Sequence, residues 1–300
     1  MRVPYVLFLL DRQNYFNINQ VVMKNILVPT DFSLVSNNAA TYAIELAKSL
    51  NYQRIIYYNV YQAPVLTEPT IPAMQVIDFD TLKKISENGL KKIRDEYAHL
   101  GEGKVEFECI SEFGVLDSSI TDICERTGSD IIVMGILGGN NIEEVLIGSS
   151  ATSVAHHTKF PVIIVPPQAM FRPLTQIVMA CDFKKVESNT PVEAIRKLLD
   201  TTGAHLSILH VDEHKKEPAD VDHQKELLKQ LFKDYLPEFF FIQNEDFAEG
   251  INDFVTDHHI DLVITIPKKH GLFDRLFKRS HTKHLAFHTN IPLMCIHEEG

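Results

Sequence analysis

The two halves of the chain are similar in sequence, which restricts the folds open to it. Four short apolar segments of the first half recur in the second half in the same order. The pairs are residues 25–32 and 176–183, 54–60 and 205–211, 130–133 and 261–264, and 160–165 and 291–296. The first pair is offset by 151 residues and the last by 131, so the second half lacks 20 residues between its second strand and its third helix. We expect much of this loss to fall on the Pro-rich loop at residues 63–72.

Within each half, short apolar runs alternate with segments of helical periodicity. In the first half the runs lie near residues 25–30, 54–60, 105–110, 131–134 and 162–165, with helical spacing near 36–50, 78–100, 115–127 and 149–158. In the second half the runs lie near residues 176–181, 205–211, 239–243, 262–266 and 293–296. Runs that are apolar on both faces predict buried parallel strands, and their alternation with helices predicts right-handed βαβ crossovers. The sequence therefore predicts an α/β fold of two tandem, five-stranded, doubly wound parallel sheets.

The domain boundaries follow from the same pattern. We expect an N-terminal extension at residues 1–22 that is poorly ordered, a first domain at 23–166, a Pro-stiffened linker at 167–174 and a second domain at 175–300. The last strands of the two domains, near residues 162–165 and 293–296, are expected to pair with each other in an internal pseudo-twofold dimer, which would cover two sheet edges. A homo-oligomer is left open.

Composition narrows the possible partners. The formal net charge of −11 argues against a nucleic-acid backbone as ligand, because no basic stripe is present to neutralise phosphates. No run reaches the ~18 apolar residues of a membrane span. The four cysteines form no CxxC pair, so we expect them to be reduced, buried side chains of a cytoplasmic protein.

A glycine-bearing loop is the candidate site. Gly135, Gly138 and Gly148 followed by Ser149 connect the apolar run at 130–134 to a helical segment at 151–157. Backbone N–H groups exposed by glycines and the positive end of a helix dipole together favour a phosphate. The alternative is that each glycine serves only a turn or a close helix–strand contact.

These segments resemble the universal stress protein family in its tandem two-domain form. The resemblance covers almost all of residues 23–297, and three motifs carry it: residues 26–33, the glycine spacing with Ser149, and residues 160–165. It implies a Rossmann-like unit of the adenine nucleotide alpha hydrolase type, usually paired through its last strand. The glycine motif implies the branch of the family that binds ATP.

The resemblance also implies roles for individual residues. It places Asp31 beside the ribose or adenine, the backbone of Val60 against the adenine edge, and Ser150 at the start of the fourth helix. It places phosphates among Gly135, Gly138, Gly148 and Ser149. The residues themselves leave open that Asp31 caps the first helix and that Ser149 caps the fourth.

Several residues depart from the family pattern. Glu143 and Glu144 lie in the glycine loop and would weaken ATP binding unless Mg²⁺ intervenes or they point to solvent. In the second half, Ile266, Lys269 and Arg279 stand at the three glycine positions, although Asp182 and Ser280 remain. Their side chains would occupy the phosphate space, so we expect ATP in the first domain only. The basic residues near this end are Lys268, Lys269, Arg275, Lys278 and Arg279, which indicate a solvated face or a site for another anion.

Three functions remain. The first is a nucleotide-binding regulatory protein of the stress-response class, with no catalytic residues and slow or absent hydrolysis. The second is a weak ATPase or nucleotidyl-transferring enzyme, and the third is a scaffold or a binder of another small molecule. The sequence has no Walker lysine loop and no G-x-S-x-G motif. His281, His284 and His288 share one helix face without acidic or cysteine partners at fixed spacing, so we expect no metal site.

Overall fold

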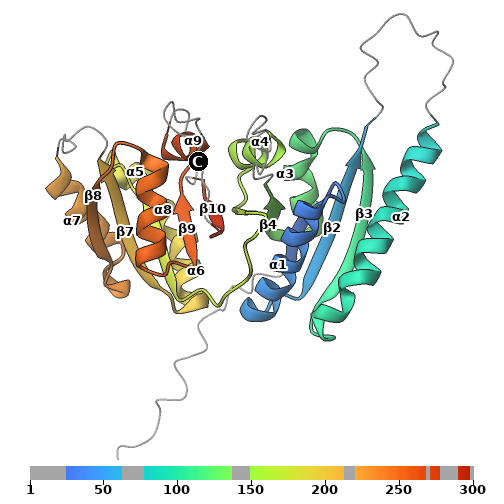
Figure 1. Cartoon of the computed structure of the whole chain (residues 1–300), viewed down its shortest axis with the longest axis horizontal. Coiled ribbons are helices and arrows are strands. Elements are labelled where there is room, and N and C mark those ends of the chain that lie inside the picture. Colours follow the sequence, from blue (N-terminus) through green and yellow to red (C-terminus); the bar gives the residue numbers. More distant parts are fainter. Residues whose placement is uncertain are drawn as a thin grey trace, which may run out of the picture.

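The computed structural model describes residues 25–62, 78–136, 149–212, 220–267, 271–277 and 290–297. They form a ten-stranded sheet with helices on both faces, in the strand order β3-β2-β1-β4-β5-β10-β9-β6-β7-β8 (Figure 1). The strands are β1 (Asn25–Pro29), β2 (Arg54–Tyr61), β3 (Glu106–Phe113), β4 (Ser129–Gly135), β5 (Val162–Val165), β6 (Gln176–Ala180), β7 (His205–Asp212), β8 (Glu238–Gln243), β9 (Leu262–Thr265) and β10 (Leu293–Cys295). The helices are α1 (Leu34–Leu50), α2 (Phe79–Tyr97), α3 (Leu116–Thr127), α4 (Ser149–His157), α5 (Val186–Asn189), α6 (Val192–Thr202), α7 (Val221–Leu231), α8 (Phe247–Asp257) and α9 (Leu272–Phe277).

The two halves of the sheet are built alike. Strands pair in parallel within each half, and the order runs outward from β1 through β2 to β3 and from β6 through β7 to β8. On the other side of β1 lie β4 and β5, and on the other side of β6 lie β9 and β10. The strand order therefore reverses once in each half, between β1 and β4 and between β6 and β9. The predicted fold class is confirmed.

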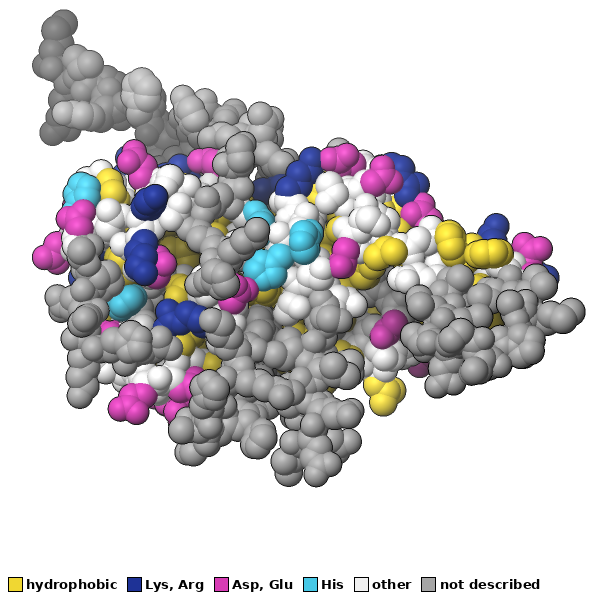
Figure 2. Space-filling model, turned by 90° about the horizontal axis from the view of Figure 1, so that it is seen from above, with side chains coloured by type: hydrophobic (Ala, Val, Ile, Leu, Met, Phe, Trp, Pro, Cys, Tyr) yellow, Lys and Arg dark blue, Asp and Glu magenta, His cyan; other side chains and the backbone are white. Residues whose placement is uncertain are grey.

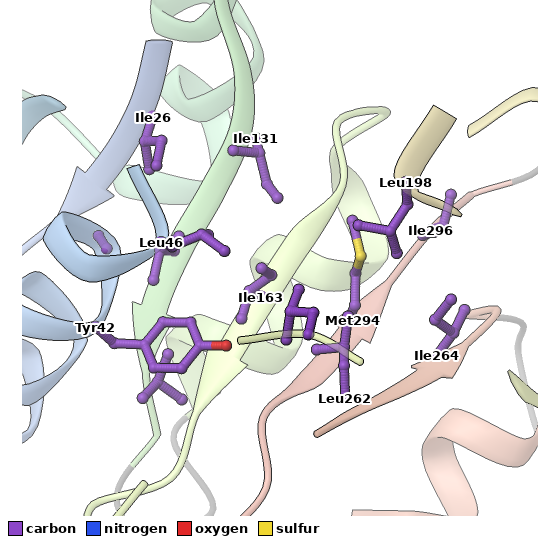
Figure 3. Close-up of a cluster of buried hydrophobic side chains, with 14 of the residues drawn as sticks. Ile26, Tyr42, Leu46, Ile131, Ile163, Leu198, Leu262, Ile264, Met294 and Ile296 are labelled. Atoms are coloured by element: carbon purple, nitrogen blue, oxygen red, sulfur yellow. The ribbon is translucent and has the colours of Figure 1, made fainter. Parts of the chain in front are cut away.

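An antiparallel pair of strands joins the halves. Leu293, Met294 and Cys295 of β10 lie opposite Ile164, Ile163 and Val162 of β5. Apolar residues of both halves meet around this junction, where Ile163 and Met294 lie between Leu46 of α1 and Leu198 of α6 (Figure 3). The expected pairing of the last strands is present, and it gives the molecule a continuous sheet.

The segment between the halves is held against the first half. The Asn38 side chain of α1 donates hydrogen bonds from Nδ2 to the carbonyl oxygens of Pro166 and Ala169, at 3.0 and 3.1 Å. The ring of Phe171 contacts the edge of Tyr42 with centroids 5.4 Å apart. These contacts add to the restriction that proline imposes on this segment. The domain boundaries themselves stay a prediction.

A proline distinguishes the second half from the first. The helix after β1 is continuous over 17 residues, whereas the chain after β6 forms the short α5 and then α6. Pro191 separates them, and Thr190 before it is extended with φ −98° and ψ 120°. A residue before proline is pushed out of the helical region, which accounts for the break.

The expectation that all four cysteines are buried is partly wrong. Cys124 and Cys295 are buried, but Cys109 and Cys181 are only half-buried. Burial raises the pKa of the Cys124 thiol to about 12, so this side chain stays protonated at neutral pH.

Among the helices that the structure describes, none is long and apolar enough to span a bilayer. The expected extension at residues 1–22 lies outside the described residues.

Candidate functional site

In the first half the strand order reverses between β1 and β4. The candidate site lies at the carboxyl ends of these two strands. In doubly wound sheets ligands bind at such a point, outside the carboxyl ends of the strands. Asp31 follows the end of β1, Val60 lies near the end of β2, and Gly135 is the last residue of β4. The carboxyl ends of β2 and β4 face upward in Figure 1, and Figure 2 looks onto this edge of the sheet.

Hydrogen bonds fix the backbone where β1 ends. The N–H of Thr30 donates to the Tyr58 carbonyl of β2 at 2.9 Å, and the Thr30 carbonyl accepts from Asn59 Nδ2 at 2.6 Å. Phe32 follows in the left-handed region, with φ 65°, and its N–H donates to Thr30 Oγ1 at 3.0 Å. Its ring lies against Gly89 of α2, where a Cβ atom would approach the ring to 2.6 Å. The turn is therefore held from both sides, and it carries Asp31 between Thr30 and Phe32.

The Asp31 carboxylate is exposed at this turn and is ionised at neutral pH. Partial burial raises its pKa, but hydrogen bonds from the Ser33 hydroxyl, the Ser33 N–H and the Ser36 hydroxyl outweigh burial and lower the pKa below its usual value. The Ser33 N–H donates to Asp31 Oδ1 at 3.0 Å. An ionised carboxylate presented at a strand end can accept hydrogen bonds from ligand hydroxyl groups.

The alternative role of Asp31 as the helix cap is wrong. Ser33 is the N-cap of α1, and its Oγ accepts from the Ser36 N–H at 3.2 Å. Since Ser33 completes the cap, Asp31 is not required for it. Ser33 lies within the motif at residues 26–33, but its role as the N-cap was not predicted from the sequence.

Gly135 is required by a close contact between β4 and α1. A Cβ atom at this position would lie 2.5 Å from the Val35 carbonyl oxygen and 2.7 Å from Val35 Cγ1. The close helix–strand contact that the sequence left as an alternative is therefore present at Gly135. It brings the first turn of α1 directly against the end of β4, which defines one side of the site.

The remaining predicted residues are only partly described. Ser149 begins α4, and Ser150 is exposed in its first turn. Val60 is half-buried near the end of β2. Gly138, Gly148, Glu143 and Glu144 lie outside the described residues. The structure thus brings Asp31, Val60, Gly135 and the start of α4 to the same edge of the sheet, as Figure 1 shows for the elements.

The turn after β6 repeats the turn after β1. The Cys181 N–H donates to the Leu209 carbonyl at 2.9 Å, and the Lys184 N–H donates to Asp182 Oδ1 at 3.0 Å. Phe183 has φ 53°, and its N–H donates to Cys181 Sγ at 3.3 Å.

A histidine in the second half takes the place of the buried Asn59. His210 Nδ1 lies 2.9 Å from the Cys181 carbonyl oxygen, as Asn59 Nδ2 lies beside that of Thr30. Asn59 and His210 occupy the same place in the second pair of similar segments, 151 residues apart. This pairing is the signal that could have revealed their role.

A pocket lies at the reversal point of the second half. Ile266, at the position corresponding to Gly135, contributes to its wall. The other lining residues are Met179, Ala180, Cys181, Asp182, Lys184, Val186, Asn189, Thr190, Gly271 and Leu272. The two halves therefore share the turn but differ where the first glycine of the motif stands.

Other candidate residues lie apart from this site or outside the described ranges. Arg275 lies over the ring of Phe247, 4.3 Å from its centroid. The other four basic residues of that end, and the histidines at 281, 284 and 288, fall outside the described residues. Within the described ranges, His, Cys, Asp and Glu side chains form no group of three or more that could hold a metal.

The fold and the candidate site together define a class: doubly wound α/β proteins in which an exposed carboxylate and a strand end packed against a helix lie where the strand order reverses. Comparison with known proteins gives the family. The chain belongs to the universal stress protein family, whose model matches residues 23–166. It is 30% identical over 164 residues to universal stress protein MJ0531 of Methanocaldococcus jannaschii. The aligned segment covers 53% of this chain and 94% of that protein.

A solved structure shares the fold over most of the chain. The crystal structure of a universal stress protein from Archaeoglobus fulgidus is similar over 92% of this chain and 97% of its own, with a TM-score of 0.65 and 20% identity. A universal stress protein solved in complex with cAMP matches 48% of this chain and 97% of its own, with a TM-score of 0.36 and 23% identity. The family predicted from the sequence is confirmed by the family model and by the similarity to MJ0531.

Proposed function

We propose that this protein binds ATP at the reversal point of its first half and acts as a nucleotide-responsive regulatory protein of the stress response. One observation carries the proposal: a turn fixed by hydrogen bonds presents the ionised, exposed Asp31 carboxylate at the carboxyl ends of β1 and β4. In this proposal Asp31 accepts hydrogen bonds from the ribose hydroxyls. The Val60 backbone meets the adenine edge.

The phosphates would lie between the strand end at Gly135 and the start of α4. Gly138, Gly148, Ser149 and Ser150 would supply backbone and hydroxyl donors, and the positive end of the α4 dipole would favour their charge. Mg²⁺ would offset the acidic residues of the loop.

Binding without rapid turnover fits these groups better than an ATPase does. Phosphoryl transfer to water needs a residue that orients the attacking water, besides groups that hold the phosphates. The glycine motif offers amide and hydroxyl donors, which hold phosphates but do not activate water. Multiple-turnover release of ADP with Mg²⁺ at a rate above about 1 s⁻¹ would instead favour the enzyme.

We propose that the second half does not bind ATP in the same way. Its turn is preserved around Asp182, but Ile266 replaces Gly135 and borders the pocket at the reversal point. The chain would then consist of two family units, of which the first binds the nucleotide and the second has lost the phosphate cradle.

A matched pair of substitutions tests the location of the site. Asp31→Asn keeps an oxygen that can accept the Ser33 N–H but removes the charge, and Asp182→Asn makes the same change in the second half. We expect Asp31→Asn to weaken ATP binding about tenfold, by about 1.4 kcal/mol, and Asp182→Asn to leave it unchanged. Isothermal titration calorimetry measures both affinities. Equal losses in the two variants would contradict a site in the first half.

Nucleotide extraction tests the proposal on the protein as purified. We expect an adenine nucleotide to co-purify with the native chain and to be lost in Gly148→Arg, which copies Arg279 of the second half into the loop. Mass analysis of the extract identifies the nucleotide. A chain that carries no nucleotide and whose melting temperature does not rise with ATP would support the third reading, a scaffold or a binder of another small molecule.

A further inference from the structure

The sheet ends on two edge strands that differ in character. On β3, glutamates recur at positions 106, 108 and 112. Glu108 is paired with Arg54 at 2.8 Å, and Glu112 is paired with Arg126. Charged side chains along an exposed edge oppose the addition of another strand. The β3 edge therefore has the composition of a protected edge.

The β8 edge lacks this protection. Its sequence is Glu-Phe-Phe-Phe-Ile-Gln, so it has no charged residue after Glu238. Phe241 is 45% exposed, and the other apolar residues of the strand are half-buried. Among the described residues no strand pairs with the outer side of β8, and an aromatic edge strand of this kind is a template for pairing with another strand.

The side chains on both faces of β8 pack against helices of the second half. Lys225 of α7 lies 5.3 Å from the ring centroids of Phe239 and Phe241 on one face. On the other face the ring of Phe240 contacts Phe254 of α8, with centroids 4.9 Å apart. The strand is thus held in place by its own half and needs no rearrangement to accept a partner.

Backbone hydrogen bonding determines which residues can pair outward. The Asn244 N–H donates to the Asp212 carbonyl of β7 at 3.2 Å. Because the direction of backbone groups alternates along a strand, residues 238, 240 and 242 also direct theirs toward β7. Phe239, Phe241 and Gln243 then direct their N–H and C=O groups away from the sheet.

We propose that β8 is a dimerisation edge that pairs antiparallel with β8 of a second copy of this chain. Alternation of the backbone groups allows a twofold axis through Phe241, which would exchange two hydrogen bonds with its own counterpart. Phe240 would lie opposite Ile242 of the second copy, and Phe239 opposite Gln243. This register buries the most exposed apolar side chain of the strand at the centre of the interface.

The second copy is favoured over a head-to-tail arrangement by the charges at the two edges. In a head-to-tail arrangement, β8 of one copy would pair with β3 of the next, which would place the glutamates of β3 beside the phenylalanines of β8. Such an arrangement would also leave a free β8 edge for a further copy, whereas a twofold dimer leaves none. The twofold dimer would leave only the glutamate-bearing β3 edges at the ends of the joined sheet. The molecule already joins its two halves by the antiparallel pairing of β5 and β10.

Solution mass measurement of the full chain tests the proposal. Light scattering coupled to size-exclusion chromatography should give twice the chain mass of 34.2 kDa at about 100 µM protein, with or without ATP. Phe241→Lys and Gln243→Pro should each weaken self-association at least about tenfold. Gln243→Pro removes only an outward N–H at the end of an edge strand, where proline is tolerated.

The control is Phe113→Lys, which changes a phenylalanine of the opposite edge that is 57% exposed. This variant should dimerise like the wild type. A wild-type chain that stays monomeric at about 100 µM would overturn the proposal, as would a dimer that neither β8 substitution weakens. Because the proposal makes no use of the nucleotide, the weaker ATP binding of Asp31→Asn should leave the dimer intact.

Discussion

At the scale of single residues, Gly135 couples the end of β4 to the start of α1. Gly135→Ala would add a Cβ atom 2.5 Å from the Val35 carbonyl oxygen, so the helix or the strand must shift. We expect a loss of about 1–3 kcal/mol in the free energy of unfolding, the usual cost of overpacking. Urea denaturation followed by circular dichroism measures it.

A second substitution identifies the contact responsible. Val35→Ala removes the Val35 Cγ1 atom, which would lie 2.7 Å from the added Cβ, but it leaves the nearer carbonyl oxygen in place. Gly135→Ala combined with Val35→Ala should therefore recover little of the lost stability. Full recovery would show that the side chain, rather than the backbone, fixes the glycine.

At the scale of elements, the turn that follows the first strand of each half depends on a side chain from the second strand. Asn59→Ala would leave the buried Thr30 carbonyl without its 2.6 Å donor, and we expect a cost of about 1–3 kcal/mol in stability. Asn59→His copies His210, whose ring nitrogen lies 2.9 Å from the Cys181 carbonyl. It should retain more stability than Asn59→Ala does.

Thermal unfolding of the three chains decides this comparison. If Asn59→His is as unstable as Asn59→Ala, the side chains of the two halves are not interchangeable at this turn. If neither variant loses stability, the hydrogen bond to Thr30 does not hold the end of β1.

Which elements form was readable from the sequence because their periodicity is strong. The run at 54–60 became β2, and the helical spacing at 115–127 became α3, each within a residue or two of its expected bounds. Short runs that are apolar on both faces predict buried parallel strands, and their alternation with helical segments gave the order of elements. The break between α5 and α6 needed the local effect of Pro191, which a periodicity pattern does not carry.

The site was only partly readable for a related reason. Asp31 and Gly135 stand at strand ends, which are located once the strands are known. Ser33 as the N-cap of α1 and Asn59 as the support of the turn depend on contacts between segments. A side-chain donor on one strand and a carbonyl on its neighbour are related by register, and register appears only when the strands are paired.

The continuous sheet joins the two halves into one folded body. The apolar cluster on each face of the sheet contains residues of both halves, among them Ile26 with Leu262 on one face and Val154 with Phe273 on the other. A core shared in this way resists separate unfolding of either half. Figure 2 views the edge of the sheet described above for the candidate site. A further contact between the two halves lies there, near α4 and α9.

That contact joins α4 of the first half to α9 of the second. His156 Nε2 lies 2.8 Å from Asp274 Oδ1, and both side chains are about one-quarter exposed. The rings of His156 and Phe273 are arranged edge to face, with their centroids 4.9 Å apart. We expect a double-mutant cycle of His156→Ala and Asp274→Ala to give a coupling of about 0.5–1 kcal/mol in the free energy of unfolding. Lys159→Ala and Glu125→Ala, a more exposed pair within the first half, are the control and should give less. A cycle that closes to zero would mean that β5, β10 and the shared core hold the halves together without this contact. A measurable coupling would mean that the contact links α9 energetically to α4, the helix that begins at the candidate site.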